Sequence, residues 1–317
     1  MNGYIDKVRR VIDEVSGVII GKDEIVREVM LSFIANGHIL LEDIPGVGKT
    51  TLALAFSRAL GLECRRVQFT PDVMPSDLTG FSVYMRNLEK FEYQPGSVFC
   101  NLLLADEINR TSPKTQSALL EVMEERKVSV DGETRPVPSP FLVIATQNPF
   151  GSAGTELLPE SQMDRFMTSM SLGYPDFESE VAMAMTVNEY NRADTVKEAL
   201  SKDELIKIQH DVHDIYIKES VYRYIVALVA ATRQSPYLEK GASPRATVAL
   251  VKMSKSAAWL DGSEYVTPDH VKDQFPYVVF HRIVLSAEAG IDGVQKEQII
   301  SEILDSVEKP PLGEKLK

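Results

Sequence analysis

One segment near the N-terminus constrains the fold of this 317-residue chain more than any other. It begins with the short apolar run His38–Leu41, passes through a loop that contains Gly46 and Gly48, and ends in the helical pattern Thr50–Leu60. A short apolar run bounded by turn residues is typical of a buried strand, and glycine permits a tight turn. The segment therefore predicts a strand, a loop and a helix in immediate succession.

The loop of this segment has the composition of a phosphate-binding loop. Backbone N–H groups of such a loop and of the following helix point at phosphates. We expect Lys49 to contact the β- and γ-phosphates of a nucleotide, and the Thr50 hydroxyl to ligate Mg²⁺. The candidate nucleotide-binding residues are Pro45, Gly46, Val47, Gly48, Lys49, Thr50 and Thr51.

The loop departs from the usual pattern at its first position. The pattern G-x-x-x-x-G-K-[ST] begins with glycine, whereas this chain has Asp43 there. Aspartate tolerates a positive φ better than most residues, so we expect the turn to form. The alternative is a glycine-rich turn that merely precedes a helix, and the strand and helix on either side argue against it.

A second candidate element is the apolar run Leu102–Ala105, which ends in Asp106 and Glu107. At the carboxyl edge of a parallel sheet, both acids would face the nucleotide. We expect Asp106 to hold Mg²⁺ and Glu107 to orient the attacking water. An apolar run before two acids is weak by itself, but its position about 55 residues after the loop strengthens it.

Three further residues are candidates for contacts with the phosphates. Asn148 ends the next apolar run and could bond the water or the γ-phosphate, although a turn asparagine before proline is an equally good interpretation. Arg165 could reach a neighbouring copy's nucleotide, or it could be a solvated side chain. Arg245 could reach back across the cleft between two domains. The candidate catalytic residues are Glu107, Asn148, Arg165 and Arg245.

The remaining pattern predicts two domains. Further apolar runs at Arg66–Phe69, Phe141–Thr146 and Phe166–Leu172 alternate with helical stretches, as in a parallel sheet covered on both faces. After Gly173 the pattern is helical, and no strand is expected. We therefore predict an α/β domain over residues 1–173 and an all-α domain over residues 174–317.

Charge and cysteine content restrict the function and the compartment. The net charge is −12, and residues 1–173 and 174–317 each carry 17 basic and 23 acidic side chains, so neither is a basic nucleic-acid module. Two cysteines, Cys64 and Cys100, do not make a disulfide framework. No apolar run is long enough to span a bilayer. We expect a cytoplasmic protein, with peripheral membrane attachment through a partner left open.

Taken together, these motifs resemble the MoxR family of AAA+ ATPases. The resemblance extends over nearly the whole chain and includes several ordered blocks. Besides the phosphate-binding loop, these blocks are Gln68–Asp72, Pro75–Gly80, Ala105–Glu121, Val130–Thr134, Ala145–Pro149, Leu158–Phe166 and Gly241–Ala246.

The resemblance implies a role for each matching residue. Asp106 and Glu107 match the Walker B pair, and Asn148 matches sensor 1. Arg165 matches the candidate arginine finger, and Arg245 matches sensor 2. The fold implied is a P-loop AAA+ core, with a parallel sheet sandwiched by helices, followed by an all-α lid.

The family also implies two hairpins and a mode of action. Met85–Tyr93, with Asn87 in its turn, and Lys127–Pro138, with Asp131-Gly132 in its turn, match hairpins expected to face a central pore or a client. Family members are ring-forming ATPases, usually hexamers, that act like chaperones on protein complexes together with von Willebrand factor A domain partners. Phe150–Thr155 departs from the family pattern, which leaves the client or interface details open.

Two other functions stay open at this point. A nucleic-acid motor of the same superfamily would place basic residues on the hairpins, but Arg86 and Lys90 stand beside Glu89 and Glu92. An ATP-gated interaction module would bind ATP with little turnover, which the intact Glu107 and Asn148 disfavour. An ATPase that uses ATP and Mg²⁺ is the expected activity.

Overall fold

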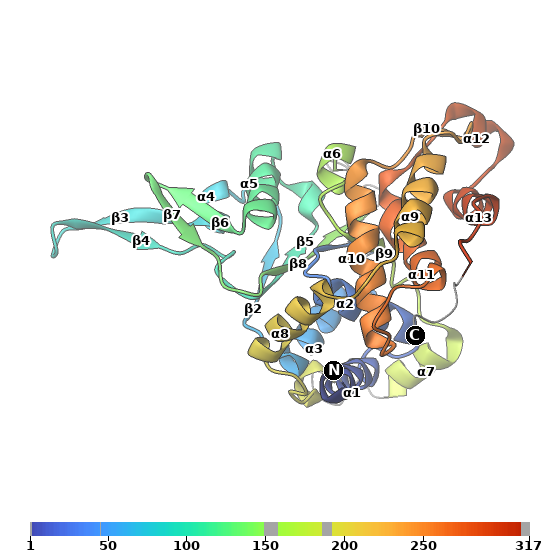
Figure 1. Ribbon diagram of the computed structural model, residues 1–317. Coiled ribbons are helices and arrows are strands. Elements are labelled where there is room, and N and C mark those ends of the chain that lie inside the picture. Colours follow the sequence, from blue (N-terminus) through green and yellow to red (C-terminus); the bar gives the residue numbers. More distant parts are fainter. Residues whose placement is uncertain (1, 45, 149–157, 186–191, 312–317) are drawn as a thin grey trace.

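The computed structural model describes residues 2–44, 46–148, 158–185 and 192–311 (Figure 1). Its centre is a five-stranded sheet in the order β2-β5-β8-β1-β9, in which every neighbouring pair is parallel. The strands are β1 (Ile39–Glu42), β2 (Cys64–Gln68), β5 (Leu102–Asp106), β8 (Leu142–Gln147) and β9 (Thr168–Met170). The predicted α/β fold class is confirmed.

Helices cover both faces of this sheet. Successive side chains of a strand point to opposite faces, and this alternation divides the core. Ile39 and Leu41 pack in one apolar cluster, whereas Leu40 packs in the other. The first cluster is covered by α1 (Asn2–Ser16), α2 (Asp23–Ile34) and α3 (Lys49–Ala59), and the second by α4 (Pro75–Thr79) and α5 (Pro113–Glu125). Both faces are apolar because both are buried.

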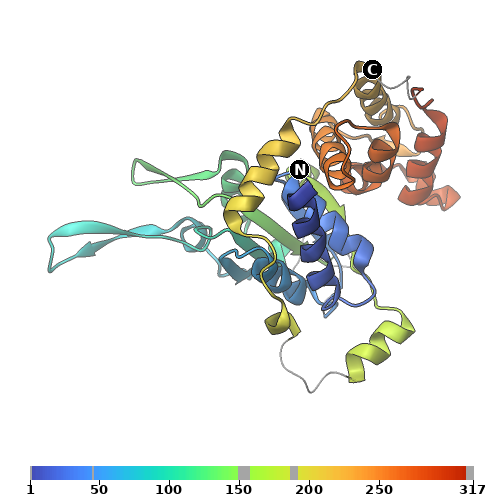
Figure 2. The same ribbon diagram turned by 60° about the horizontal axis from the view of Figure 1, so that its bottom comes forward.

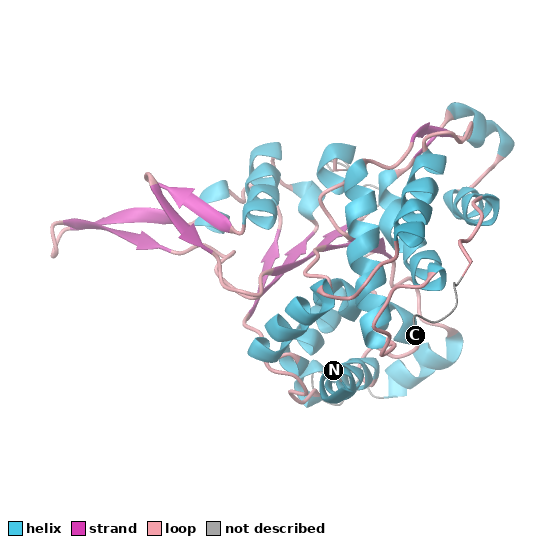
Figure 3. Ribbon diagram, in the orientation of Figure 1, coloured by secondary structure: helices cyan, strands magenta, loops and turns pink. Residues whose placement is uncertain are grey.

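Two β-hairpins project from the body in the same general direction (Figures 1 and 3). One pairs β3 (Phe81–Met85) with β4 (Lys90–Gln94), and the other pairs β6 (Lys127–Val130) with β7 (Glu133–Pro136). Asp131 and Gly132 have φ values of 53° and 78°, as a two-residue hairpin turn requires. Both predicted hairpins are therefore present.

The C-terminal part is mostly helical, as predicted, and lies beside the sheet domain (Figure 2). A two-stranded antiparallel sheet also occurs there, so the expectation of no strand after residue 173 is wrong. These strands have three and two residues, too few to produce a recognisable alternation. The elements of this part are α7 (Phe177–Met185), α8 (Lys202–His213), α9 (Glu219–Thr232), β10 (Leu238–Lys240), α10 (Pro244–Leu260), α11 (Pro268–Val279), β11 (Val284–Leu285), α12 (Ala287–Asp292) and α13 (Lys296–Ser306), with 3-10 turns η2 (Arg192–Thr195) and η3 (Phe280–Arg282). The sheet domain also contains the 3-10 turn η1 (Ile108–Arg110) and the short helix α6 (Glu160–Met163).

The two parts share a continuous apolar core. The cluster that begins between α1 and α2 continues through the C-terminal helices, and it contains Trp259, the single tryptophan, which is fully buried near the end of α10. Within the described ranges, no helix is long and apolar enough to cross a membrane. The division of the chain near Gly173 stays a prediction.

Candidate functional site

The loop between β1 and α3 has the backbone that close approach to a ligand requires. Gly46 and Gly48 have φ values of 90° and 96°, a region in which any side chain would be strained. Gly48 is the N-cap of α3 and has no side chain to cap it, so the first N–H groups of the helix stay available. Thr50 and Thr51 are half-buried in the first turn. Pro45 lies outside the described residues.

Lys49, the first residue of α3, lies near the carboxylates of Asp106, the last residue of β5, and Glu107, the next residue. Its Nζ donates hydrogen bonds to the carbonyl oxygens of Asp43, at 3.0 Å, and Ile44, at 3.1 Å. Burial lowers the pKa of Lys49, and the negative charges of Asp43, Asp106 and Glu107 oppose that shift. The ammonium group of Lys49 therefore interacts electrostatically with both predicted carboxylates, those of Asp106 and Glu107.

Asp43 has a structural role that differs from the predicted one. Its backbone does not have a positive φ, so the tolerance argued from the sequence is not what permits aspartate here. Its buried carboxylate accepts hydrogen bonds from Ser171 Oγ at 2.6 Å, Leu172 N at 2.8 Å and Gly173 N at 2.9 Å. Asp43 therefore ties the start of the loop to the chain that leaves β9.

Asp106 and Glu107 are organised by a threonine of the neighbouring strand. Thr146 Oγ1 donates to Asp106 Oδ1 at 2.7 Å and accepts from the backbone N of Glu107 at 2.8 Å. Glu107 has a left-handed backbone, with φ 56° and ψ 50°. Such strain in a residue with a side chain persists only where the surrounding contacts enforce it, and it is concentrated at functional sites.

Three polar side chains that the sequence analysis did not select hold these carboxylates. Arg66 Nη2 lies 2.8 Å from Asp106 Oδ2. Glu107 Oε2 accepts from Gln68 Nε2 at 2.7 Å and from Arg110 Nη1 at 2.6 Å. The available signal was pairing, because β2 lies beside β5 and the side chains of Arg66 and Gln68, two residues apart, share one face of the sheet.

The residues at this edge of the sheet fit a nucleotide with Mg²⁺. The Thr50 hydroxyl and the Asp106 carboxylate are hard oxygen donors, which Mg²⁺ prefers. Apart from the chain neighbours of each glycine, no described residue has an atom within 4 Å of a Cβ built on Gly46 or Gly48, so the loop backbone is open to an approaching group. Asn148 directly follows β8 at the same edge, and Phe150–Thr155 lies outside the described residues.

Arg165 and Arg245 meet at a different place. Arg165 precedes β9 and Arg245 is the second residue of α10, yet both pair with Glu124 near the end of α5. Arg245 Nη2 lies 2.6 Å from Glu124 Oε1, and Arg165 Nη1 lies 3.6 Å from Glu124 Oε2. All three residues line a cavity of about 390 Å³.

This cavity lies at the opposite edge of the sheet from the phosphate-binding loop. It is lined by residues that precede β1 and β9, such as His38 and Met167, whereas the loop follows β1. At 3.3 Å per residue, the path from His38 to Asp43 is roughly 16 Å. Contrary to expectation, Arg245 therefore does not reach across to its own chain's loop.

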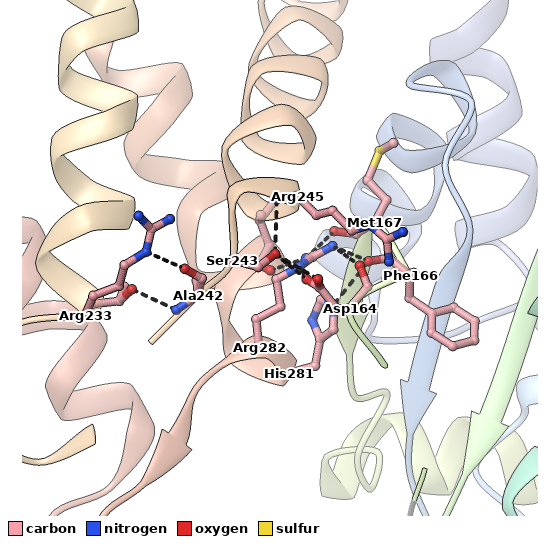
Figure 4. Close-up of polar contacts among 11 residues, drawn as sticks. Asp164, Phe166, Met167, Arg233, Ala242, Ser243, Arg245, His281 and Arg282 are labelled. Atoms are coloured by element: carbon pink, nitrogen blue, oxygen red, sulfur yellow. Dashed lines mark hydrogen bonds and ion pairs between the residues drawn. The ribbon is translucent and has the colours of Figure 1, made fainter. Parts of the chain in front are cut away.

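A polar junction around the buried Arg282 holds this geometry (Figure 4). Asp164 accepts from Ser243 Oγ, at 2.8 and 3.0 Å, and from Arg282 Nε at 2.8 Å. The guanidinium of Arg282 also bonds the carbonyl oxygens of Phe166 and Met167. Ser243 is the N-cap of α10, so the junction fixes the start of that helix beside Arg165.

Comparisons with known proteins agree with this architecture. Residues 38–168 match the family described as "ATPase family associated with various cellular activities (AAA)", and residues 230–303 match the "AAA lid domain". The chain is 42% identical to YeaC of Bacillus subtilis over 95% of this chain and 94% of that protein. It is 39% identical to Chaperone MoxR1 of Mycobacterium tuberculosis, over 98% of this chain and 84% of that protein.

A solved structure supports the whole fold. A crystal structure of a protein from Cytophaga hutchinsonii superimposes with a TM-score of 0.90 at 39% sequence identity. It covers 97% of this chain, and the match extends over 96% of the other chain. The arrangement of the sheet domain beside the helical domain is therefore shared with a protein of closely similar sequence.

Proposed function

The chain belongs to the MoxR family of AAA+ ATPases, and on that premise we propose that it hydrolyses ATP to ADP and phosphate to remodel, mature or activate partner protein complexes. The observation that carries the proposal is that the parallel sheet places the loop that leads to Lys49 at the same edge as Asp106 and Glu107, because β1 and β5 both pair with β8 and end at that edge. These are the residue types that phosphoryl transfer to water requires.

In this proposal each residue of the loop edge has a distinct task. The loop N–H groups and Lys49 bind the phosphates and neutralise their charge. Thr50 and Asp106 hold Mg²⁺, which supplies further neutralisation of the phosphate oxygens when bound. Glu107 orients the attacking water, and Asn148 bonds that water or the γ-phosphate.

Completion of the site by a second copy is supported by the opposite placement of the two arginines. The length of β1, roughly 16 Å from His38 to Asp43, separates the edge that carries Arg165 and Arg245 from their own loop, and a single side chain does not bridge that length. A head-to-tail assembly would bring this edge of one copy against the loop edge of the next, and such contacts close into rings. We propose a homo-oligomeric ring with six members, as is usual in the family, in which both arginines act in trans.

Clients and partners are proposed from the family and from the exposed hairpins. The β3–β4 hairpin carries exposed apolar side chains at its surface, among them Phe81, Tyr84 and Phe91, and exposed patches of this kind mark interaction sites. We propose that this hairpin and the β6–β7 hairpin contact a client protein, with a von Willebrand factor A domain protein as partner.

The free thiols of Cys64 and Cys100 suit the cytoplasm.

Two variants test the ATPase proposal by release of phosphate from ATP. Glu107→Gln is expected to bind ATP but to lose about 10²- to 10⁴-fold in turnover, since the water loses its orienting carboxylate. Arg165→Ala is expected to be inactive while keeping its affinity for ATP. Arg223→Ala is the matched control, because Arg223 is an exposed arginine whose ion pair in the described part of the chain is with Glu219 of its own helix.

Mixing the two inactive variants tests action in trans. A Glu107→Gln subunit offers an intact Arg165 to a neighbour that has an intact Glu107, so partial activity should return. No recovery on mixing would contradict the in-trans role of Arg165. Near-normal turnover by Glu107→Gln would contradict the role of Glu107, and ATP binding without phosphate release by the unaltered chain would contradict the ATPase itself.

A further inference from the structure

The cavity that contains Arg165 and Arg245 carries more positive than negative charge. Among the described residues, two acidic side chains line it, Glu124 and Asp164, against five basic ones, which are Arg126, Arg165, Arg245, Lys252 and Arg282. Asp164 forms an ion pair with Arg282, in which Asp164 Oδ1 lies 2.8 Å from Arg282 Nε. His38 adds no charge, because burial lowers its pKa well below the usual value. The volume of about 390 Å³ is within the roughly 300–1,000 Å³ of small-molecule sites.

Two of the cations have no carboxylate partner among the described residues. Arg126 bonds only carbonyl and amide oxygens, those of Phe141 and Asn36. Lys252 Nζ has neither a hydrogen bond nor an ion pair within the described ranges. Burial lowers the pKa of Lys252, and the positive charge of Arg126 lowers it further. The two like charges thus repel each other, which an anion between them would relieve.

Arg165 has unused donor capacity in the same cavity. Its Nε is buried and has no hydrogen-bond partner among the described residues, and its ion pair with Glu124 is long at 3.6 Å. A buried donor without a partner costs about 1–3 kcal/mol. Glu124 therefore neutralises the two arginines only in part, and one exposed carboxylate is shared between them.

We propose that this cavity is a second phosphate-binding site, in which Lys252 and Arg126 join Arg165 and Arg245 on a phosphate group that displaces Glu124. Phosphate fits the chemistry because guanidinium and ammonium groups both bind its oxygens. The phosphate can come from free solution or from the nucleotide of a neighbouring copy. In the second case the proposal rests on the proposed function and extends it to Lys252, Arg126 and Glu124.

Inorganic pyrophosphate is the probe, titrated calorimetrically at low ionic strength into the full chain carrying Lys49→Ala. The Lys49→Ala substitution removes the ammonium group of the phosphate-binding loop, so that the measured pyrophosphate binding is to the cavity. Adding Lys252→Ala is expected to weaken binding about 5- to 10-fold, by loss of a charge-assisted contact. Adding Glu124→Gln is expected to tighten it about 2- to 5-fold, since the competing negative charge is gone.

The control is Lys255→Ala, three residues further along α10. Lys255 Nζ donates to the carbonyl oxygen of His213 and does not line the cavity, so binding should not change. Opposite effects of Lys252→Ala and Glu124→Gln separate a binding role from general damage to the fold. Absence of pyrophosphate binding, or no response to either substitution, would overturn the proposal.

A second measurement distinguishes the two sources of phosphate. Sedimentation velocity follows ATP-dependent assembly of the Glu107→Gln chain with and without Lys252→Ala. Weaker assembly identifies the neighbour's nucleotide as the source, and unchanged assembly with lost pyrophosphate binding identifies free phosphate. The ATPase proposal is judged separately by phosphate release from the unaltered chain, so either idea can fail alone.

Discussion

Replacing Asp43 with glycine would restore the usual first residue of the phosphate-binding loop, and we expect this change to damage the protein. The sequence pattern alone would suggest an improvement or no effect. In the structure, the Asp43 carboxylate accepts three hydrogen bonds from the chain that leaves β9. Asp43→Gly removes the acceptor and leaves all three donors behind.

The magnitude follows from the burial of those donors. Leu172 is only 2% exposed, so water does not replace the lost acceptor of its N–H group. An unsatisfied buried donor costs about 1–3 kcal/mol, and the donors at Ser171 and Gly173 are partly accessible to water and cost less. We expect a total loss of about 3–5 kcal/mol in the free energy of unfolding, together with weaker ATP binding because the loop loses its anchor.

Urea unfolding followed by far-ultraviolet circular dichroism measures this loss. Asp72→Gly is the control, because Asp72 lies in an exposed turn and the same substitution there costs at most about 1 kcal/mol of backbone entropy. Asp43→Asn, which keeps one acceptor oxygen, should fall between the two. If Asp43→Gly is as stable as Asp72→Gly, the anchoring role of the carboxylate is refuted.

Three further predictions concern other polar contacts. Burial raises the pKa of Glu28 from 4.5 to about 7, so the folded state favours the protonated form. The free energy of unfolding should therefore fall by about 3 kcal/mol as the pH rises from 4.5 to above 7. Urea titrations that compare the unaltered chain with Glu28→Gln measure this difference. Asp164→Asn should cost about 3 kcal/mol in the same assay, because Arg282, whose side chain is 2% exposed, loses its counter-ion. Arg66→Ala should tighten Mn²⁺ binding in the presence of ADP about 2- to 5-fold, measured by electron paramagnetic resonance, because it removes the cation paired with Asp106; unchanged affinity would contradict competition at that carboxylate.

The residues at the loop edge of the site could be predicted because short sequence motifs identify them. Lys49 and Thr50 follow β1 after a six-residue loop, and Asp106 and Glu107 lie at the end of β5. In a parallel sheet the carboxyl ends of strands share one edge, so four residues separated by more than 50 positions are brought together by the sheet itself. That pattern predicts neither the hydrogen-bond partners of these residues nor the left-handed backbone of Glu107.

The position of Arg245 could not be predicted, since it depends on how the helical part docks. That docking is fixed by contacts such as Ser243 and Arg282 with Asp164, which lie 79 and 118 positions apart in the chain. No periodicity or motif spacing carries such information. The same holds for Glu124, an ordinary charged residue at the end of a helix until two distant arginines reach it.

The single tryptophan gives this chain a built-in optical reporter. Trp259 is fully buried near the end of α10, within apolar side chains contributed by both parts of the chain. Its emission should therefore be blue-shifted at rest and move to longer wavelength only when water enters that junction. No second indole competes for the signal, so intrinsic fluorescence can follow the separation of the helical part in real time without a label.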